Sequence, residues 1–73
     1  MANDKAAGSA SEQVQQQIRE TITDGTWPAG TKIPSENKLA ELYGVSRVTV
    51  RAAIQRLASM GLLESRQGGG TFV

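Results

Sequence analysis

The sequence contains no cysteine and no histidine. These absences exclude disulfide bridges, thiolate nucleophiles, histidine acid–base catalysis and the usual zinc sites. No apolar run approaches the roughly 18 residues that a membrane span needs, and the N-terminus lacks the pattern of a signal peptide. We therefore expect a cytoplasmic protein without membrane contact, which uses no cofactor and is stabilised by packing alone.

The composition that remains is that of one small globular domain. The chain has 73 residues, of which 38% are apolar and 21% charged, and a chain of this size buries only a modest core. The net charge of +1 hides a local excess, because three arginines and no acidic residue lie between Glu41 and Glu64. Such a basic stripe is typical of a protein that binds a polyanion, although a solvated helix face would look the same.

Periodicity predicts three helices. Residues 1–10 have no apolar period, so we expect a disordered tail followed by a domain over residues 11–73. Ser9 and Glu12 fit a capping box, and a stripe of Val14, Ile18 and Ile22 predicts a first helix over about 11–24. The second helix is expected to begin after Ser35 and to end at Gly44, and the third to span about 47–60. In the second helix, the residues expected to point inward are Leu39, Ala40 and Leu42.

The last part of the chain changes to a β pattern. Residues 62–66 and 71–73 are expected to form two strands around a glycine-rich turn at 67–70, and residues 31–33 a further, very short strand. The predicted fold is therefore mainly α with a small β-hairpin. Its second and third helices, joined by a short turn with Gly44, form a helix-turn-helix pattern.

The third helix has two chemically distinct faces. At about 100° per residue, one face collects the apolar residues Val50, Ala53, Ile54, Leu57 and Met60. The opposite face carries Arg47, Val48, Arg51 and Gln55. Arginine can donate two hydrogen bonds to guanine, glutamine can pair with adenine, and a methyl group can touch thymine. The second face therefore suits the major groove of DNA, which the N-terminal residues of a recognition helix usually reach first.

Two further features could contact phosphate. Ser35 and Ser46 lie at helix N-termini, where unpaired N–H groups and the helix dipole favour anions; both serines could equally act as caps alone. Gly68, Gly69 and Gly70 allow the backbone of the hairpin tip, beside Arg66 and Gln67, to approach a ligand closely, but could also form a plain turn. No Gly-Lys-Ser/Thr sequence and no helix follow, so the glycines are not a nucleotide-binding loop. Trp27 and Tyr43 are interpreted as core-edge residues, not base-stacking platforms.

A family resemblance rests on several joined motifs. They are Ile33-Pro34-Ser35-Glu36, Gly44-Val45-Ser46-Arg47-Val48-Thr49-Val50-Arg51, and Arg66-Gln67-Gly68-Gly69-Gly70-Thr71-Phe72-Val73. Together they resemble the N-terminal winged helix-turn-helix domain of GntR-type bacterial transcriptional regulators, over about residues 11–73. Each motif alone would be weak, whereas the joined pattern is specific.

The resemblance implies a metabolite-responsive repressor or activator that binds double-stranded DNA as a homodimer at a palindromic operator. It also implies a C-terminal domain, absent from this sequence, that binds a small-molecule effector and dimerises. Arg47 and Arg51 correspond to the recognition-helix arginines, and Ser46 and Thr49 to hydroxyl contacts with phosphate. Val48 stands at a position that varies in the family, which implies a part in operator preference.

The resemblance also implies contacts from the second helix and from the hairpin. The wing tip, formed by Gln67, Gly68 and Gly69, is expected to enter the minor groove. Asn37 and Lys38 follow the Pro-Ser-Glu motif, in the helix that helps to contact DNA. The family often has arginine at the position of Asn37.

Two other classes of function fit the sequence less well. A winged helix that binds proteins tends to expose apolar residues on its third helix in place of arginine, and here only Val48 would be such a residue. An enzyme would need an assembled acid–base pair or nucleophile, whereas the few carboxylates are scattered along the predicted helices. The sequence therefore predicts a sequence-specific DNA-binding domain and no enzyme.

Overall fold

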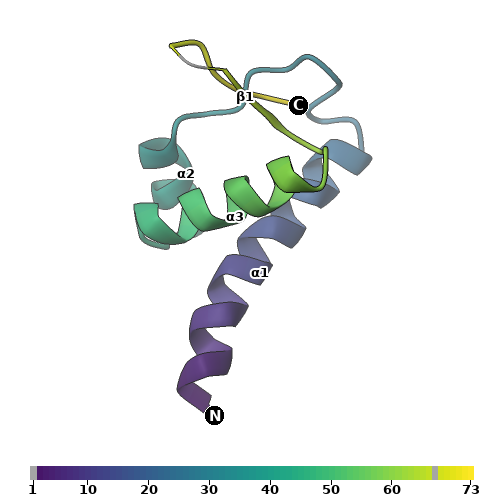
Figure 1. The fold of residues 1–73 in the computed structure, drawn as a ribbon. Helices are drawn as coiled ribbons and strands as arrows, with labels where there is room; N and C mark the ends of the chain where they lie inside the picture. Colours follow the sequence, from purple (N-terminus) through teal and green to yellow (C-terminus); the bar gives the residue numbers. More distant parts are fainter. Residues whose placement is uncertain (1, 67) are drawn as a thin grey trace.

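Within residues 2–66 and 68–73, whose backbone this computed structural model describes, three helices precede a two-stranded hairpin (Figure 1). The helices are α1 (Ala2–Thr23), α2 (Glu36–Tyr43) and α3 (Arg47–Ser59), and the antiparallel strands are β1 (Glu64–Arg66) and β2 (Gly70–Phe72). Side chains are described for residues 10–66 and 68–73. The predicted fold class, mainly α with a small hairpin in a winged helix-turn-helix arrangement, is confirmed.

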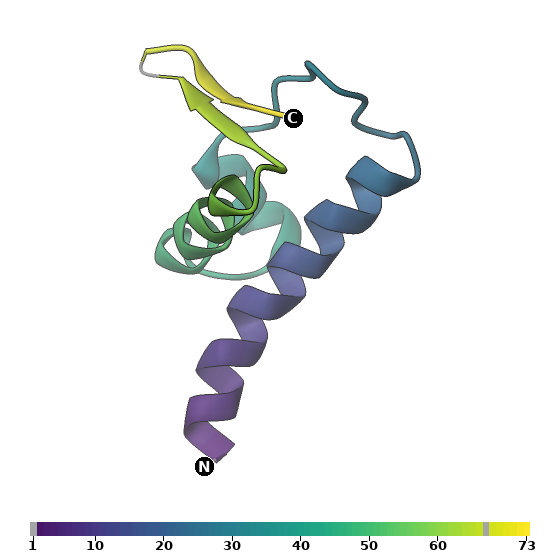
Figure 2. The same cartoon turned by 45° about the vertical axis from the view of Figure 1, so that its right-hand side comes forward.

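Helix α1 begins earlier than the sequence pattern predicts. It starts at Ala2 instead of residue 11, so the expected disordered tail over residues 1–10 is wrong for residues 2–10, and Ser9 lies inside the helix instead of capping it. The reason is intrinsic propensity: this segment holds four alanines, the residue that most favours helix, and needs no apolar stripe to continue the helix. Its N-terminal part extends away from the other elements in both views (Figures 1 and 2).

The core lies where the three helices meet and extends under the hairpin. Ile18 of α1, Leu39 of α2 and Leu57 of α3 are fully buried. Around them lie the other buried apolar residues, Val14, Ile33, Val50, Ala53, Ile54 and Leu63. Trp27 and Tyr43 pack against this core from its edge, as predicted, and burial raises the pKa of the Tyr43 phenol.

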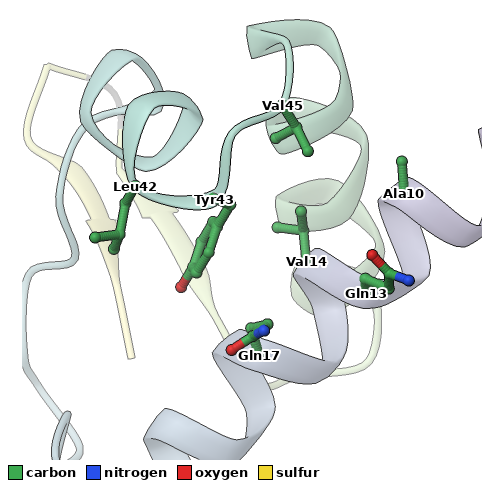
Figure 3. A pocket seen from close by; sticks show the side chains of 7 residues that line it. All are labelled: Ala10, Gln13, Val14, Gln17, Leu42, Tyr43 and Val45. Atoms are coloured by element: carbon green, nitrogen blue, oxygen red, sulfur yellow. The ribbon is translucent and has the colours of Figure 1, made fainter.

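Two residues expected in the core are exposed instead. Leu42 is 64% exposed because Leu39, Ala40 and Tyr43 define the inner side of α2, and at about 100° per residue Leu42 lies outside that arc. Met60 is 48% exposed because α3 ends at Ser59 and Met60 is already its C-cap. Figure 3 shows the groove between α1 and α2, with the Tyr43 ring directed toward Gln17 and Leu42 among the lining residues.

The hairpin is joined to the segment that leads into α2. Its register pairs Glu64 with Phe72 and Arg66 with Gly70. The strand expected over residues 31–33 is reduced to a single antiparallel bridge between Lys32 and Phe72. Around this bridge, the N–H of Ile33 donates to the carbonyl of Thr71 at 2.9 Å, and the N–H of Val73 to that of Thr31 at 2.8 Å. The position of the hairpin is thereby fixed relative to the start of α2.

Among the described residues, no helix combines the length and the apolar character that a membrane span needs.

Candidate nucleic-acid interface

The helix-turn-helix unit is held by local hydrogen bonds that the sequence predicts. Ser35 and Ser46 have extended backbones, and their hydroxyl oxygens accept from the N–H groups of Lys38 and Thr49, each at 3.2 Å. Gly44 adopts the left-handed conformation, with φ 69°, that allows the chain to leave α2. The expected N-caps and turn are confirmed. The hydroxyls of Ser46 and Thr49 also lie 3.0 Å apart at the exposed start of α3.

Helix α3 presents the predicted polar face to solvent. Val50, Ala53, Ile54 and Leu57 are buried, whereas Arg47, Val48, Arg51 and Gln55 are exposed. Val48 is 74% exposed, so its methyl groups are accessible to a ligand. The orientation of the helix is therefore confirmed, and the DNA contacts of these residues stay predictions.

Arg51 is paired with a carboxylate that the sequence analysis left outside the site. The Nε–H of Arg51 donates to Oε2 of Glu36 at 3.3 Å, and Nη2 donates to Oε1 at 3.1 Å. The hydrogen bond and then the charge of Glu36 raise the pKa of Arg51. In the sequence analysis, Glu36 appears only as part of the Pro-Ser-Glu motif. No periodicity relates two residues that are 15 apart on different helices, so only the fold reveals the pair.

A groove runs between the hairpin and the N-termini of α2 and α3. Its polar lining residues are Lys32, Ser35, Glu36, Asn37 and Arg47, with Gly70 and Thr71 on the hairpin side. Lys38 is not among them, because it lies on the outer side of α2 with Glu41 and Leu42. The groove is open to solvent and contains two cations from separate chain segments, Lys32 and Arg47, together with the carboxylate of Glu36.

Lys32 is a candidate residue that sequence reasoning missed. A Cβ at Gly70 would lie 2.7 Å from the Lys32 Cε, and Gly70 has φ +98°. A side chain at Gly70 would therefore have to adopt an unfavourable backbone conformation and displace the end of the Lys32 side chain, which lies along the base of the hairpin. The one available signal was its position two residues before Pro34, in the segment expected to form a short strand.

The hairpin tip has the glycine geometry expected of a tight turn. Gly68 and Gly70 have positive φ, and the N–H of Gly69 donates to the carbonyl of Arg66 at 3.0 Å. The Arg66 guanidinium lies over the Phe72 ring, 4.6 Å from its centroid, and pairs with Glu64 at 3.3 Å. Gln67, the other residue predicted at this tip, lies outside the described residues. Minor-groove contacts from Gln67, Gly68 and Gly69 stay predictions.

Comparison with known proteins identifies relatives in both sequence and structure. The HTH-type transcriptional regulator YisV of Bacillus subtilis (strain 168) is 52% identical over 61 residues, which cover 84% of this chain and 13% of YisV. The HTH-type transcriptional regulator Mce2R of Mycobacterium tuberculosis (strain CDC 1551 / Oshkosh) is 49% identical over 65 residues, which cover 89% of this chain and 27% of Mce2R. The chain thus spans less than a third of either regulator.

Among solved structures, the fold matches that of AraR(DBD) in complex with operator ORR3. The TM-score is 0.84 at 50% sequence identity, over 88% of this chain and 77% of that chain. Residues 10–73 also match the family described as bacterial regulatory proteins, gntR family. This chain therefore belongs to the gntR family of bacterial regulatory proteins, and residues 10–73 form its helix-turn-helix domain.

Proposed function

We propose that this chain binds double-stranded DNA in a sequence-specific manner, with α3 in the major groove and the β1–β2 hairpin as a wing at the minor groove. The observation that carries the proposal is the exposed polar face of α3. It is supported by AraR(DBD), which has the same fold and 50% sequence identity and whose structure was solved in complex with an operator. In both views of the molecule, the hairpin tip and the N-terminal end of α3 lie on the same side (Figures 1 and 2).

Base reading is assigned to the outer face of α3. Arg47 and Arg51 can each donate two hydrogen bonds to O6 and N7 of guanine, and Val48 can contact a thymine methyl group. Gln55 can pair with adenine one turn further along the helix. The burial of Val50 and Leu57 on the opposite face fixes the rotation of α3, so all these groups reach the groove together.

Phosphate contacts are assigned to the surroundings of α3. The neighbouring hydroxyls of Ser46 and Thr49 lie at the start of α3, and the cation of Lys32 lies in the groove beside Arg47. Ser35, Asn37 and Lys38 lie at the start of α2, where N–H groups and the helix dipole favour anions. Such contacts position a protein on the duplex without reading its sequence. The tip formed by Gln67, Gly68 and Gly69 is assigned to the minor groove.

The domain is further proposed to act within a longer transcriptional regulator. The relatives YisV and Mce2R are named as transcriptional regulators, and the alignments cover only 13% and 27% of them. A homodimer would present two copies of α3 to an inverted repeat, and a separate domain would bind the small-molecule effector. Repression is supported by a 47% identical relative from Escherichia coli named "Probable fructoselysine utilization operon transcriptional repressor".

Selection from a random duplex pool tests the proposal directly. DNA retained by the 73-residue chain is sequenced, and the enriched site is titrated in competition with an unrelated duplex. We expect the selection to enrich a half-site that contains guanine, and we expect the chain to bind this site more tightly than the unrelated duplex. Arg56→Ala is the matched control for Arg47→Ala, because Arg56 lies exposed near the end of α3 and about 180° from Arg47 at helical spacing. An unbiased retained pool would overturn the proposal.

A further inference from the structure

We propose that Glu36 is a positioning residue for base reading: it holds Arg51 side-on, so that the other edge of the guanidinium is directed to guanine. The inference rests on the proposed DNA-binding function and adds to it a residue that need not touch DNA. Its basis is the contact between the first residue of α2 and the second turn of α3, the two helices of the helix-turn-helix unit.

The geometry of the pair leaves one edge of Arg51 available. A guanidinium is planar and carries five N–H donors. Glu36 accepts from Nε and from Nη2, at 3.3 and 3.1 Å. Within the part of the chain that the structure describes, no other side chain accepts from this group. Both hydrogens of Nη1 and the second hydrogen of Nη2 therefore remain for a ligand. One hydrogen from each of these two nitrogens forms the edge that can contact O6 and N7 of guanine together.

If Glu36 orders the Arg51 side chain before DNA binds, the complex with the correct DNA sequence is favoured. A long arginine side chain loses conformational freedom when it is fixed at an interface, and a side chain that is already ordered loses less. Arg51 is 60% exposed and Glu36 36% exposed, so the pair stands at the surface where DNA would dock. Since surface ion pairs contribute little to folding stability, the contact between these two residues is better explained by orientation than by stability.

The negative charge of Glu36 also disfavours non-specific complexes with DNA. A carboxylate on a DNA-binding surface repels phosphate and neutralises part of the charge of Arg51, which weakens binding that depends on charge alone. Guanine is recognised by directed hydrogen bonds to neutral acceptors, so the specific contact loses less. Glu36 is therefore expected to increase the ratio between specific and non-specific affinity.

The test compares Glu36→Gln with Glu41→Gln, the matched control. Glu41 is an exposed carboxylate on the same helix, and its substitution removes the same charge without touching Arg51. Dissociation constants are measured for the selected operator and for an unrelated duplex of equal length. We expect Glu36→Gln to lower the specificity ratio by about two- to fivefold, the range that an exposed ion pair can supply. Glu41→Gln should leave the ratio unchanged.

A double-mutant cycle assigns the effect to Arg51. Once Arg51 is replaced by alanine, Glu36→Gln should no longer change the ratio, whereas independent effects would add. The Nε–H resonance of Arg51, followed by NMR in the free protein, should sharpen with Glu36 present and broaden in Glu36→Gln. This signal reports the pair directly and is not altered by a general loss of charge.

The outcomes separate the two proposals. If wild-type protein prefers the operator but Glu36→Gln keeps the ratio, or changes it only as Glu41→Gln does, the positioning role is overturned while the proposed function stands. Additive effects in the cycle would overturn it as well. If wild-type protein shows no preference for any duplex, the proposed function fails and the positioning role fails with it.

Discussion

At the scale of single residues, position decides what a basic side chain can do. Arg47 and Arg51 lie on the outer face of α3, which the buried residues of that helix orient away from the core. Lys38 lies on the outer side of α2 beside Glu41. The three cations therefore have the same sign of charge but different expected contacts, bases for the arginines and phosphate for the lysine.

Alanine substitutions should distinguish these contacts. Arg47→Ala and Arg51→Ala should each weaken binding to the selected operator by about 1–3 kcal/mol and relax the preference for guanine. Lys38→Ala should weaken all duplexes alike. Dissociation constants on the operator and on single-base variants provide the measurement. Uniform, equal losses from all three substitutions would mean that the arginines only position the protein.

Gly70 should tolerate a side chain far less well than its neighbour. Alanine at Gly70 must adopt φ +98° and displace the Lys32 side chain, so we expect a loss of about 1–2 kcal/mol in the free energy of unfolding. Gly69 is the control, because it lacks a positive φ and a Cβ there would make ordinary contacts, the nearest at 3.5 Å. Chemical denaturation of both variants measures the difference. Equal stability of the two would show that the hairpin base adapts freely.

At the scale of elements, the two faces of α3 separate folding from binding. Leu57 is fully buried between helices, so Leu57→Ala should lower the free energy of unfolding by roughly 2–5 kcal/mol. Gln55→Ala, on the exposed face, should leave the melting temperature nearly unchanged. Thermal melts followed by circular dichroism provide the comparison. A larger loss from Gln55→Ala would mean that the helix is rotated relative to this description.

The same scale explains what the sequence could predict. The N-caps Ser35 and Ser46 and the turn at Gly44 are local signals, since each depends on residues within one turn of the chain. These were predicted correctly, as were the buried and exposed faces of α3 with the exception of Met60. The early start of α1 was missed because alanine-rich segments form helix without an apolar period.

The features that the sequence did not predict depend on tertiary contacts. Glu36 meets Arg51, and Lys32 meets Gly70, only after the helices and the hairpin have packed. Leu42 and Met60 are apolar residues that periodicity placed inside, while the actual ends and rotation of α2 and α3 place them outside. The candidate DNA-contacting residues on one helix face could thus be predicted from the sequence. The residues that orient them, such as Glu36, could be identified only from the three-dimensional structure.

At the scale of the whole molecule, binding should depend strongly on salt. The basic residues gather in the part of the chain that forms the helix-turn-helix unit and the hairpin, although the net charge is only +1. Each phosphate contact releases counterions, so the logarithm of affinity should fall linearly with that of salt concentration. Titrations between 50 and 200 mM salt measure the slope. A change of less than about threefold would contradict a phosphate-contacting surface.

The 73-residue chain is expected to be a monomer that binds a single half-site weakly. Among the side chains that the structure describes, the exposed large apolar residues are dispersed: Leu42 lies on α2, Val48 at the start of α3 and Met60 just after its end. Val14 and Ile18 of α1 are buried in the core. We expect micromolar binding or weaker, and a gain of about 10²- to 10⁴-fold on an inverted repeat after fusion to a dimerising coiled coil. Sedimentation and half-site titration measure both. A stable dimer, or nanomolar half-site binding, would contradict this expectation.

The backbone pairing of Val73 gives the molecule a mechanical property. Its N–H bonds to Thr31 and its carbonyl accepts from Gly30, so residue 73 is tied into the same ladder as the wing and the entry to α2. A polypeptide joined after Val73 would begin at a backbone position that hydrogen bonds hold in place. A rotation of that polypeptide would therefore rotate the whole domain, because no flexible linker separates the two. The first few residues of any fused segment, more than its length, would then set the angle between two recognition helices.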